Sequence, residues 1–322
     1  MPESIVPLSN YIDIHFNLRE VIPLLTIHTS DVVYAMSREN PPAAWAKSGD
    51  TVCFETLDCY AGQITAEDPC WKAIDWSLVN PATGPLFIED AMPGDVLKVE
   101  ILDIRVASQG VMADGPGRGI TGQALAERTA RLFPVEDGFI LFNNTLRIPI
   151  CPMIGVIGTA PAEASIDTGT PGSHGGNMDC KRITAGSVLY LPVAVEGALL
   201  ALGDLHARMG DGEVAICGLE IGGRVTVRVT VVKDCTLPTP FLVNDDCAAA
   251  IYSEKTLEDA NEGATMAMHG FLTRELGLTA HEAGMLLSIA GNLRICQVVD
   301  PLMTCRMEIP RSIAKDCGYS FP

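Results

Sequence analysis

Histidine, amide and carboxylate side chains gather in a glycine-rich segment near the middle of the chain. The segment reads Gly172-Ser-His-Gly-Gly-Asn-Met-Asp-Cys180, which places His174, Asn177 and Asp179 close together. Glycine lets the backbone take positive φ values and approach a ligand closely. An imidazole nitrogen, an amide oxygen and a carboxylate on one turn are suitable donors for a divalent metal. A turn capped by an Asn or Asp side chain explains the same pattern, and the residues alone leave both interpretations open.

A second group of candidates follows an apolar, strand-like run. If that strand continues, Asp204 and His206 project from one face, because side chains alternate along a strand. Asp211-Gly212 then predicts a tight turn into another strand over 214–221. Glu220 has the parity of the apolar residues in that strand, so we expect it to be buried. A buried carboxylate is paired with a cation or a metal, or has a raised pKa.

An early segment, Val52-Cys-Phe-Glu-Thr-Leu-Asp-Cys-Tyr60, offers two more carboxylates. Glu55 and Asp58 lie near the end of a predicted strand and could add oxygen ligands to a site. The alternative is a solvent-exposed strand end. Cys217 is a candidate nucleophile by composition only, since no Lys or Arg lies close to it in sequence to lower the pKa of its thiol. No Gly-x-Ser-x-Gly motif is present.

The overall charge argues against some classes of partner. The chain of 322 residues has 22 Lys and Arg against 40 Asp and Glu, so its net charge is −18. Nucleic acid and anionic lipid both need a basic surface, so we expect neither as a partner. A small neutral substrate is compatible with this charge. The most apolar stretch, 186–205, is interrupted by Pro192 and Glu196, and we do not expect it to span a membrane.

Cysteine usage and the first residues predict a cellular compartment. The 11 cysteines are irregularly spaced and form no Cys-x-x-Cys motif. This pattern favours buried, reduced thiols in a cytoplasmic protein over a disulfide framework or a Cys-rich zinc site. The opening residues, MPESIVPLSNYIDIHF, lack a basic segment followed by an apolar one, so we expect no secretory signal.

The elements that must position these side chains are mostly short strands separated by Gly and Pro. The run 225–231 alternates apolar and polar residues with the period of a strand that has one buried face. The run 97–106 also alternates but changes phase near Ile101, which indicates a β-bulge. Two further strands are predicted late in the chain, at 293–299 and 306–309.

Helices are expected to be scarce and to lie mostly late in the chain. Apolar residues recur at helical spacing over 257–272, and a second helix is predicted over 279–289. We expect a single domain over 1–322. It could divide into a β-rich part with the site motifs, 1–235, and a helix-containing part, 236–322.

Several longer motifs run through nearly the whole chain. Two of them contain the histidines, His174-Gly-Gly-Asn-Met-Asp179 and Gly203-Asp-Leu-His-Ala-Arg-Met-Gly-Asp-Gly-Glu213, and motifs of this length rarely arise by chance. With the others, they make the chain resemble the acetamidase/formamidase family. The segment 110–132 diverges, and we expect it to shape the substrate pocket. The matching segments are 52–64, 80–95, 174–179, 189–193, 203–213, 218–220 and 293–301.

The resemblance implies hydrolysis of a small neutral amide to a carboxylate and ammonia. It also implies a β-rich α/β architecture, with packed β-sheets flanked by helices in an α/β/β/α-like arrangement, and self-association into a homo-oligomer such as a homodimer. A divalent metal, zinc or calcium, is associated with the family. The mixture of His and carboxylate ligands favours Zn²⁺. An oxygen-rich set of Asp58, Asn177 and Glu220 would instead suit Ca²⁺.

Roles can be assigned to the positions that match the family motifs. Glu220 is the first choice as general base and later proton donor, and Glu55 is the second. The backbone N–H groups of Gly175 and Gly176 would stabilise the oxyanion. Asn177 is a ligand or an amide-binding group, and Asp58 ligates the metal or orients a histidine. The candidate metal ligands are His174, Asn177, Asp179, Asp204, His206 and Asp58.

Two alternatives belong to other classes. One is a cysteine-dependent amidohydrolase that uses Cys217. The other is a non-catalytic metal-binding or ligand-binding protein with the same fold. The intact acidic and His motifs argue against the second alternative, because a site that has lost its function has no need for so many buried charges.

Overall fold

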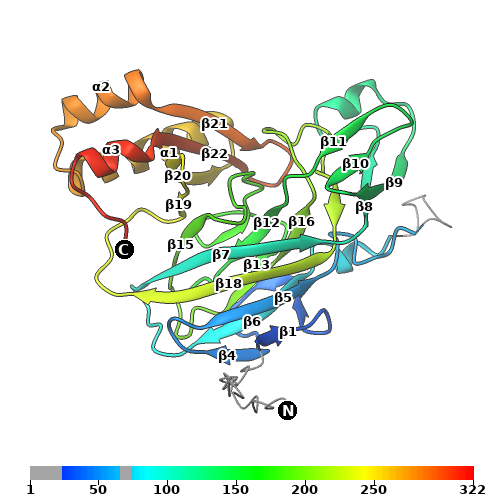
Figure 1. Cartoon of the computed structure of the whole chain (residues 1–322), viewed down its shortest axis with the longest axis horizontal. Helices are drawn as coiled ribbons and strands as arrows, with labels where there is room; N and C mark the ends of the chain where they lie inside the picture. Colours follow the sequence, from blue (N-terminus) through cyan, green and yellow to red (C-terminus); the bar gives the residue numbers. More distant parts are fainter. Residues whose placement is uncertain (1–23, 66–73) are drawn as a thin grey trace, which may run out of the picture.

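Two large β-sheets pack against each other, and helices cover one end of the first sheet (Figure 1). The computed structural model describes residues 24–65 and 74–322. The opening residues, for which we expect no secretory signal, and Cys70 lie outside these ranges. The ten cysteines within the described ranges are free thiols. The described part of the chain contains no helix that is both long and apolar enough to cross a membrane.

The first sheet has nine strands, and only β1 and β5 pair in parallel. Its last strands come from the part of the chain after residue 236, so this part extends the same sheet. In spatial order the strands are β1 (Leu25–Ile27), β5 (Thr51–Thr56), β18 (Gly223–Val232), β7 (Val96–Val106), β15 (Val188–Pro192), β19 (Phe241–Val243), β20 (Cys247–Glu254), β22 (Met303–Pro310) and β21 (Asn292–Gln297).

The predicted β-bulge lies between β7 and β18. Thr226 is opposite Asp103 and Val227 is opposite Ile101, which leaves Leu102 as the extra residue. This confirms the change of phase read near Ile101. The bulge turns Leu102 out to solvent and brings Ile104 back against the core.

The second sheet has eleven strands, and it carries most of the candidate site residues. A separate two-stranded sheet pairs β3 (Ala35–Met36) with β13 (Ile166–Asp167). The main path of the second sheet is β11 (Arg147–Pro149), β10 (Phe139–Leu141), β9 (Thr129–Glu136), β8 (Gln109–Asp114), β17 (Glu220–Ile221), β16 (Leu200–His206), β12 (Met153–Gly158) and β14 (Gly175–Asn177). Beside β16 lie β6 (Ala82–Ile88), β2 (Val32–Val33) and β4 (Ala44–Ala46).

The main hydrophobic core fills the space between the two sheets. Phe54 and Val227 from the first sheet and Leu202 and Leu205 from the second are fully buried in it. Removing their apolar surface from water stabilises the folded state by roughly 25 cal/mol per Å². This core holds the ends of β5, β12 and β16 in fixed positions, and the candidate site forms at these ends.

The helices pack on β20 and β22 through a second core. They are α1 (Leu257–Arg274), α2 (Ala280–Ala290) and α3 (Arg311–Asp316). Thr256 caps α1 by accepting a hydrogen bond from Asp259 N at 3.1 Å, and Thr279 forms a capping box with Glu282. Both predicted helices are confirmed.

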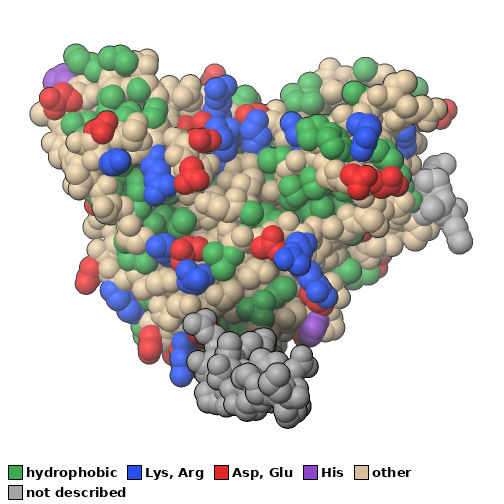
Figure 2. Space-filling view, in the orientation of Figure 1, with side chains coloured by type: hydrophobic (Ala, Val, Ile, Leu, Met, Phe, Trp, Pro, Cys, Tyr) green, Lys and Arg blue, Asp and Glu red, His purple; other side chains and the backbone are tan. Residues whose placement is uncertain are grey.

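The surface in Figure 2 mixes charges of both signs. Lys and Arg side chains lie among Asp and Glu side chains on this face. Apolar side chains reach the surface over α2, where Met285 and Ile289 are exposed.

Candidate active site

His206 lies at the centre of a cluster of buried carboxylates. Its Nε2 is 3.0 Å from Glu220 Oε1, 3.7 Å from both Asp179 Oδ1 and Asp204 Oδ1, and 3.9 Å from Glu213 Oε1. All five side chains are at most 5% exposed. One imidazole cannot balance four carboxylates, so the cluster must hold protons or bind a cation.

Two of the carboxylates lie over β12: Asp204 in β16, and Asp179 just after β14. Asp179 and Asp204 have positive φ values of 42° and 53°, which are uncommon for residues other than glycine. Gly155 on β12 lies beneath both. A Cβ atom at this position would be 2.5 Å from Asp179 Oδ1 and 2.6 Å from Asp204 Oδ2. The absence of a side chain at Gly155 therefore allows the two carboxylates to lie over β12.

The loop between β16 and β17 supplies Glu213, and β17 itself supplies Glu220. The strand predicted over 214–221 is wrong for most of its length, because only Glu220–Ile221 forms β17. Glu213 and Ile216 have φ values of 47° and 89°, and Ile216 N donates to Glu213 O at 3.0 Å. This tight loop turns Glu213 toward His206 beside Glu220. Such strained residues cluster at functional sites.

The pKa values of the cluster reflect its unbalanced charge. Burial raises the pKa of Asp179 and of Glu213 well above the usual range, and the neighbouring carboxylates raise both further. Burial and the Asp204 charge raise the pKa of Glu220 to about 8. Burial alone would lower the pKa of His206, but the Glu220 and Asp204 charges raise it well above its ordinary value. For Asp204, burial would raise the pKa, but the neighbouring His206, with Glu220, lowers it.

Asp300 and Glu213 belong to the cluster but were not among the sequence candidates. Asp300 lies between β21 and β22, where Asn177 Nδ2 donates to its Oδ2 at 3.0 Å. Burial and the Glu213 charge raise the pKa of Asp300 well above the usual range. Both residues stand inside motifs that matched the family. That position is the signal that could have identified them.

A small cavity of about 140 Å³ opens against the cluster. Arg118 lines it, so the divergent segment 110–132 contributes to its wall, and the guanidinium of Arg118 lies 5.1 Å from the centre of the Trp76 ring. The lining residues are Cys59, Tyr60, Trp76, Val79, Asn80, Arg118, Asn177, Asp179, Asp204, Glu213, Ile216, Cys217, Glu220 and Asp300.

The donor atoms of the cluster fit a divalent cation. Three groups of side chains have ligand atoms within 4.8 Å of one another: Cys59, Asp204 and Glu220; Asp179, Asp204 and His206; and His206, Glu213 and Glu220. Several buried atoms here have no hydrogen-bond partner, and unpartnered buried polar atoms are rare in folded proteins. They are Asn177 Oδ1, Asp179 Oδ1, His206 Nδ1, Glu213 Oε2 and Glu220 Oε2.

His174 is buried, but the structure does not bring it into these groups. Its ring lies close to Gly172 and Gly176, and neither ring nitrogen has a hydrogen-bond partner. Burial lowers the pKa of His174 to about 4, so the ring is neutral at physiological pH. Its role as a metal ligand stays a prediction.

The two glycines proposed for the oxyanion lie in tightly packed backbone. Gly175 N donates to Gly172 O at 3.1 Å. Gly175 and Gly176 have φ values of 96° and 76°, and a Cβ atom on either would lie 2.4 Å from a carbonyl oxygen, so glycine is needed here for close packing. Neither lines the cavity. The role of their N–H groups toward an oxyanion stays a prediction.

Glu55 is also outside the site. Its carboxylate lies 2.8 Å from His28 Nδ1 and 2.7 Å from Arg224 Nη2, in an ion-paired group at the edge of the protein. Glu55 does not line the cavity, and its role as a second general base stays a prediction.

Asp58 lies in a turn just after β5. Its Oδ1 accepts hydrogen bonds from Tyr60 N at 2.9 Å and Gly62 N at 3.1 Å. Burial, and to a lesser extent the charge of Asp204, raises the pKa of Asp58. Asp58 therefore shapes this turn, and its role as a metal ligand or as a group that orients a histidine stays a prediction.

Cys217 lines the cavity, but its surroundings do not activate a thiol. Its Sγ donates to Ala113 O at 3.3 Å. Burial and the Glu220 charge raise the pKa of Cys217 far above its ordinary value. A nucleophilic cysteine needs the opposite environment, one that favours the thiolate.

The fold and this site agree with the comparison to known families. The model of the Acetamidase/Formamidase family matches residues 35–168 and 162–316. The chain belongs to this family.

Solved structures of similar chains share the whole fold. An acetamidase from Bacillus halodurans is 49% identical with a TM-score of 0.90, over 91% of this chain and 100% of that one. A predicted acetamidase/formamidase from Thermoanaerobacter tengcongensis is 45% identical with a TM-score of 0.90, over 92% and 99%. Acetamidase of Mycolicibacterium smegmatis is 30% identical over 60% of this chain. The chain spans 62% to 64% of the length of the curated relatives it matches.

Proposed function

We propose that this chain hydrolyses small linear amides, of the formamide and acetamide class, to a carboxylate and ammonia. The observation that carries the proposal is the small cavity against a buried cluster of His206 and carboxylates, in a chain of the Acetamidase/Formamidase family. Curated relatives named formamidase and acetamidase support this substrate class.

The size and lining of the cavity suit a small neutral amide. A volume of about 140 Å³ holds only a few water-sized molecules, at roughly 30 Å³ each. Asn177 Oδ1 is buried and without a partner, so it can accept a hydrogen bond from the substrate NH₂ group. Val79 and Ile216 offer apolar contacts to a short acyl group.

Glu220 is the best placed group for proton transfer. Amide hydrolysis needs a base that takes a proton from water and an acid that returns it to the departing nitrogen. Glu220 lines the cavity, and its raised pKa of about 8 allows both states near neutral pH. His206, 3.0 Å away, orients the carboxylate and stabilises its charged form.

A divalent metal would be held by Asp179, Asp204 and His206, with Glu213 beside them. When bound, it would lower the pKa of water to about 7 and polarise the substrate carbonyl. The mixture of imidazole and carboxylate donors favours Zn²⁺, and the abundance of oxygen donors makes Ca²⁺ the alternative.

The test measures ammonia release from formamide, acetamide and propionamide, before and after chelation and after addition of Zn²⁺ or Ca²⁺. We expect hydrolysis of at least one amide, loss with chelator and recovery with one ion. Failure on all three amides under every condition would overturn the proposed function. Loss with a thiol-alkylating reagent but not with chelator would move the reaction to Cys217.

We further propose that the protein is a cytoplasmic homo-oligomer. The acidic composition, the reduced cysteines and the family resemblance support this proposal. Sedimentation of the purified protein at several concentrations tests the assembly, and a monomer throughout would contradict it.

A further inference from the structure

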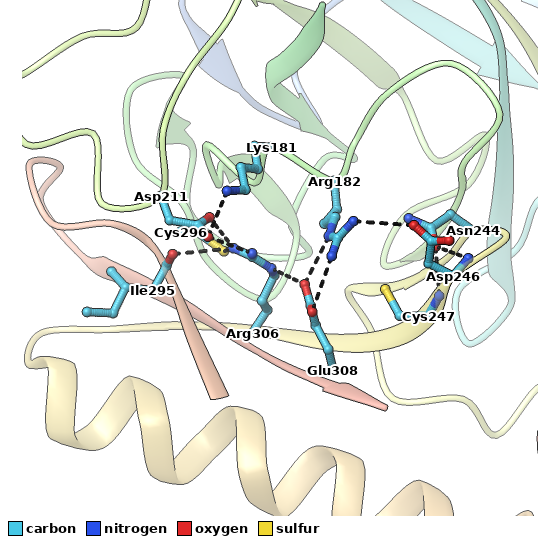
Figure 3. Close-up of polar contacts among 10 residues, drawn as sticks. All are labelled: Lys181, Arg182, Asp211, Asn244, Asp246, Cys247, Ile295, Cys296, Arg306 and Glu308. Carbon is cyan, nitrogen blue, oxygen red and sulfur yellow. Dashed lines mark hydrogen bonds and ion pairs between the residues drawn. The ribbon is translucent and has the colours of Figure 1, made fainter. Parts of the chain in front are cut away.

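Arg306 is a fully buried arginine that does not touch the cavity. It lies on β22 with its side chain 1% exposed, and two of its nitrogens form a fork around Asp211 (Figure 3). Nη1 donates to Asp211 Oδ1 at 2.8 Å, Nη2 donates to Oδ2 at 3.1 Å, and Nε donates to Glu308 Oε1 at 2.7 Å. Burying a guanidinium costs several kcal/mol before pairing. The Arg306–Asp211 pair lies next to the turn that carries Glu213.

The fork holds the turn that leads into Glu213. Asp211 stands two residues before Glu213, and Gly212 N between them donates to Cys296 O at 2.8 Å. Arg306 Nη1 also donates to Ile295 O at 3.3 Å. The turn is therefore tied to β21 and β22 through its backbone and through one side chain, immediately before Glu213 adopts a positive φ.

The same network reaches the segment that follows Asp179. Lys181 Nζ lies 2.9 Å from Asp211 Oδ2, and Arg182 Nε donates to Glu308 at 3.1 Å. Figure 3 shows Glu308 between the guanidinium groups of Arg182 and Arg306. Two site carboxylates on separate loops are thus anchored to one network.

The site needs such an anchor because its acids repel one another whenever they are ionised. Glu213 and Asp179 approach the same His206 nitrogen, at 3.9 and 3.7 Å, in a region where water does not screen their charges. The loop that carries Glu213 must be held from behind against this repulsion.

We propose that Arg306, through its fork on Asp211, is a positioning residue that keeps Glu213 against His206. The kinetic part of this inference rests on the proposed amide hydrolysis, and the structural part does not.

The first test compares Arg306→Lys with Arg311→Lys. Lysine keeps the charge but loses the fork. We expect Arg306→Lys to lower kcat/KM about 10- to 100-fold, the usual effect of changing a group that orients site ligands. Arg311→Lys is the control, since Arg311 donates to Asn244 O and pairs with Asp245, outside the network that holds Asp211, and it should change kcat/KM by less than about twofold. Equal losses in the two variants would overturn the proposal.

A double-mutant cycle separates positioning from general stabilisation. If Arg306 acts through Glu213, Arg306→Lys has little further effect in a Glu213→Gln background. A purely structural role would reduce activity by the same factor in both backgrounds, and that result would overturn the proposal.

Crystal structures of Arg306→Lys and Asp211→Asn give a readout that needs no activity. We expect the distance of 3.9 Å between Glu213 Oε1 and His206 Nε2 to increase in both variants. An unchanged distance would overturn the positioning role, even if the wild type proves inactive on every amide. Asp211 is 29% exposed, so Asp211→Asn decides the question if Arg306→Lys fails to fold.

Discussion

Two clusters of acids lie side by side in this chain, and their charges are balanced in opposite ways. In the Arg306 network, burial alone would raise the pKa values of Asp211 and Glu308, but the hydrogen bonds and charges of Arg306, together with those of Lys181 at Asp211 and Arg182 at Glu308, lower both. In the site cluster, Glu213 and Glu220 share one imidazole with other carboxylates, and their pKa values are raised.

The two clusters share a turn, which makes the difference instructive. Asp211 faces a guanidinium and Glu213, two residues later, faces other acids. Glu308 is nearly as buried as the acids of the site, so burial and acidity alone do not identify the site. The distinguishing feature of the site is that its carboxylates lack enough positive charge nearby. Such an arrangement does not stabilise the fold, but it suits proton transfer or the binding of a cation.

Glu220→Gln should give the largest effect on the site side of the comparison. Glutamine keeps the size of the side chain but cannot accept a proton, so kcat should fall about 10²- to 10⁴-fold. The change also removes an incompletely paired buried acid, so Tm should not fall. Ammonia release and thermal unfolding of one preparation check both expectations. A parallel loss of rate and stability would place Glu220 with the structural acids.

Gly155→Ala tests whether close approach of the carboxylates matters. The new Cβ would lie 2.5 Å from Asp179 Oδ1, so Asp179 or Asp204 must move. We expect kcat/KM to fall about 10- to 100-fold, with a loss of roughly 1–3 kcal/mol in unfolding free energy.

The control for that variant is Gly284→Ala in α2, where nothing lies within 4 Å of the added Cβ. A helical Gly to Ala change should stabilise by up to about 1 kcal/mol and leave kcat/KM unaltered. If both variants keep full activity, the position of the two carboxylates over β12 is not critical.

Much of the fold could be predicted because local periodicity reports which face of an element is buried. The strand at 225–231, the helix at 257–272 and the bulge near Ile101 all follow from spacing and are confirmed. The strand at 214–221 is wrong, because the chain turns at Glu213 and Ile216, which have positive φ values, and Val214 O accepts from Ile120 N in a distant segment.

The site could be predicted in part. Asp204 and His206 are brought together as strand alternation indicated, with the side chains 3.7 Å apart. Asp300 lies between β21 and β22 and contacts Asn177, which is 123 residues away in sequence, and spacing does not report such a contact. Glu55 is drawn away by Arg224, its partner across β5 and β18, and no local pattern shows that pairing.

The pH dependence of stability should separate the two clusters in chelator-treated protein. Glu220 has its pKa raised from 4.5 to about 8 in the folded state, so the folded protein binds more protons and the unfolding free energy falls as pH rises through this window. The lowered pKa of Asp211 has the opposite sign: its contribution is present above pH 3.8 and is lost as pH falls below it.

Denaturant unfolding at a series of pH values between about 3 and 9 measures how the unfolding free energy changes with pH on both sides. Glu220→Gln should flatten the decline above pH 4.5, and Asp211→Asn should flatten the decline on the acidic side. If Glu220→Gln removes the acidic decline in unfolding free energy, or Asp211→Asn removes the decline at high pH, the separation of structural from functional acids is wrong.

Glu55→Gln should give the smallest effect, although Glu55 stands in a motif shared with the family. Its carboxylate already has two partners, His28 and Arg224, whose side chains are 62% and 66% exposed. Exposed ion pairs contribute less than about 1 kcal/mol. The hydrogen bond with His28 lowers the pKa of Glu55, so this carboxylate stays ionised near neutral pH and is a weaker base than Glu220.

We therefore expect Glu55→Gln to change kcat/KM by less than about twofold, measured beside Glu220→Gln with the same amide. A loss comparable to that of Glu220→Gln would mean that a carboxylate with its countercharge in place takes part in the reaction. The missing countercharge would then no longer separate the functional acids of this chain from its structural ones.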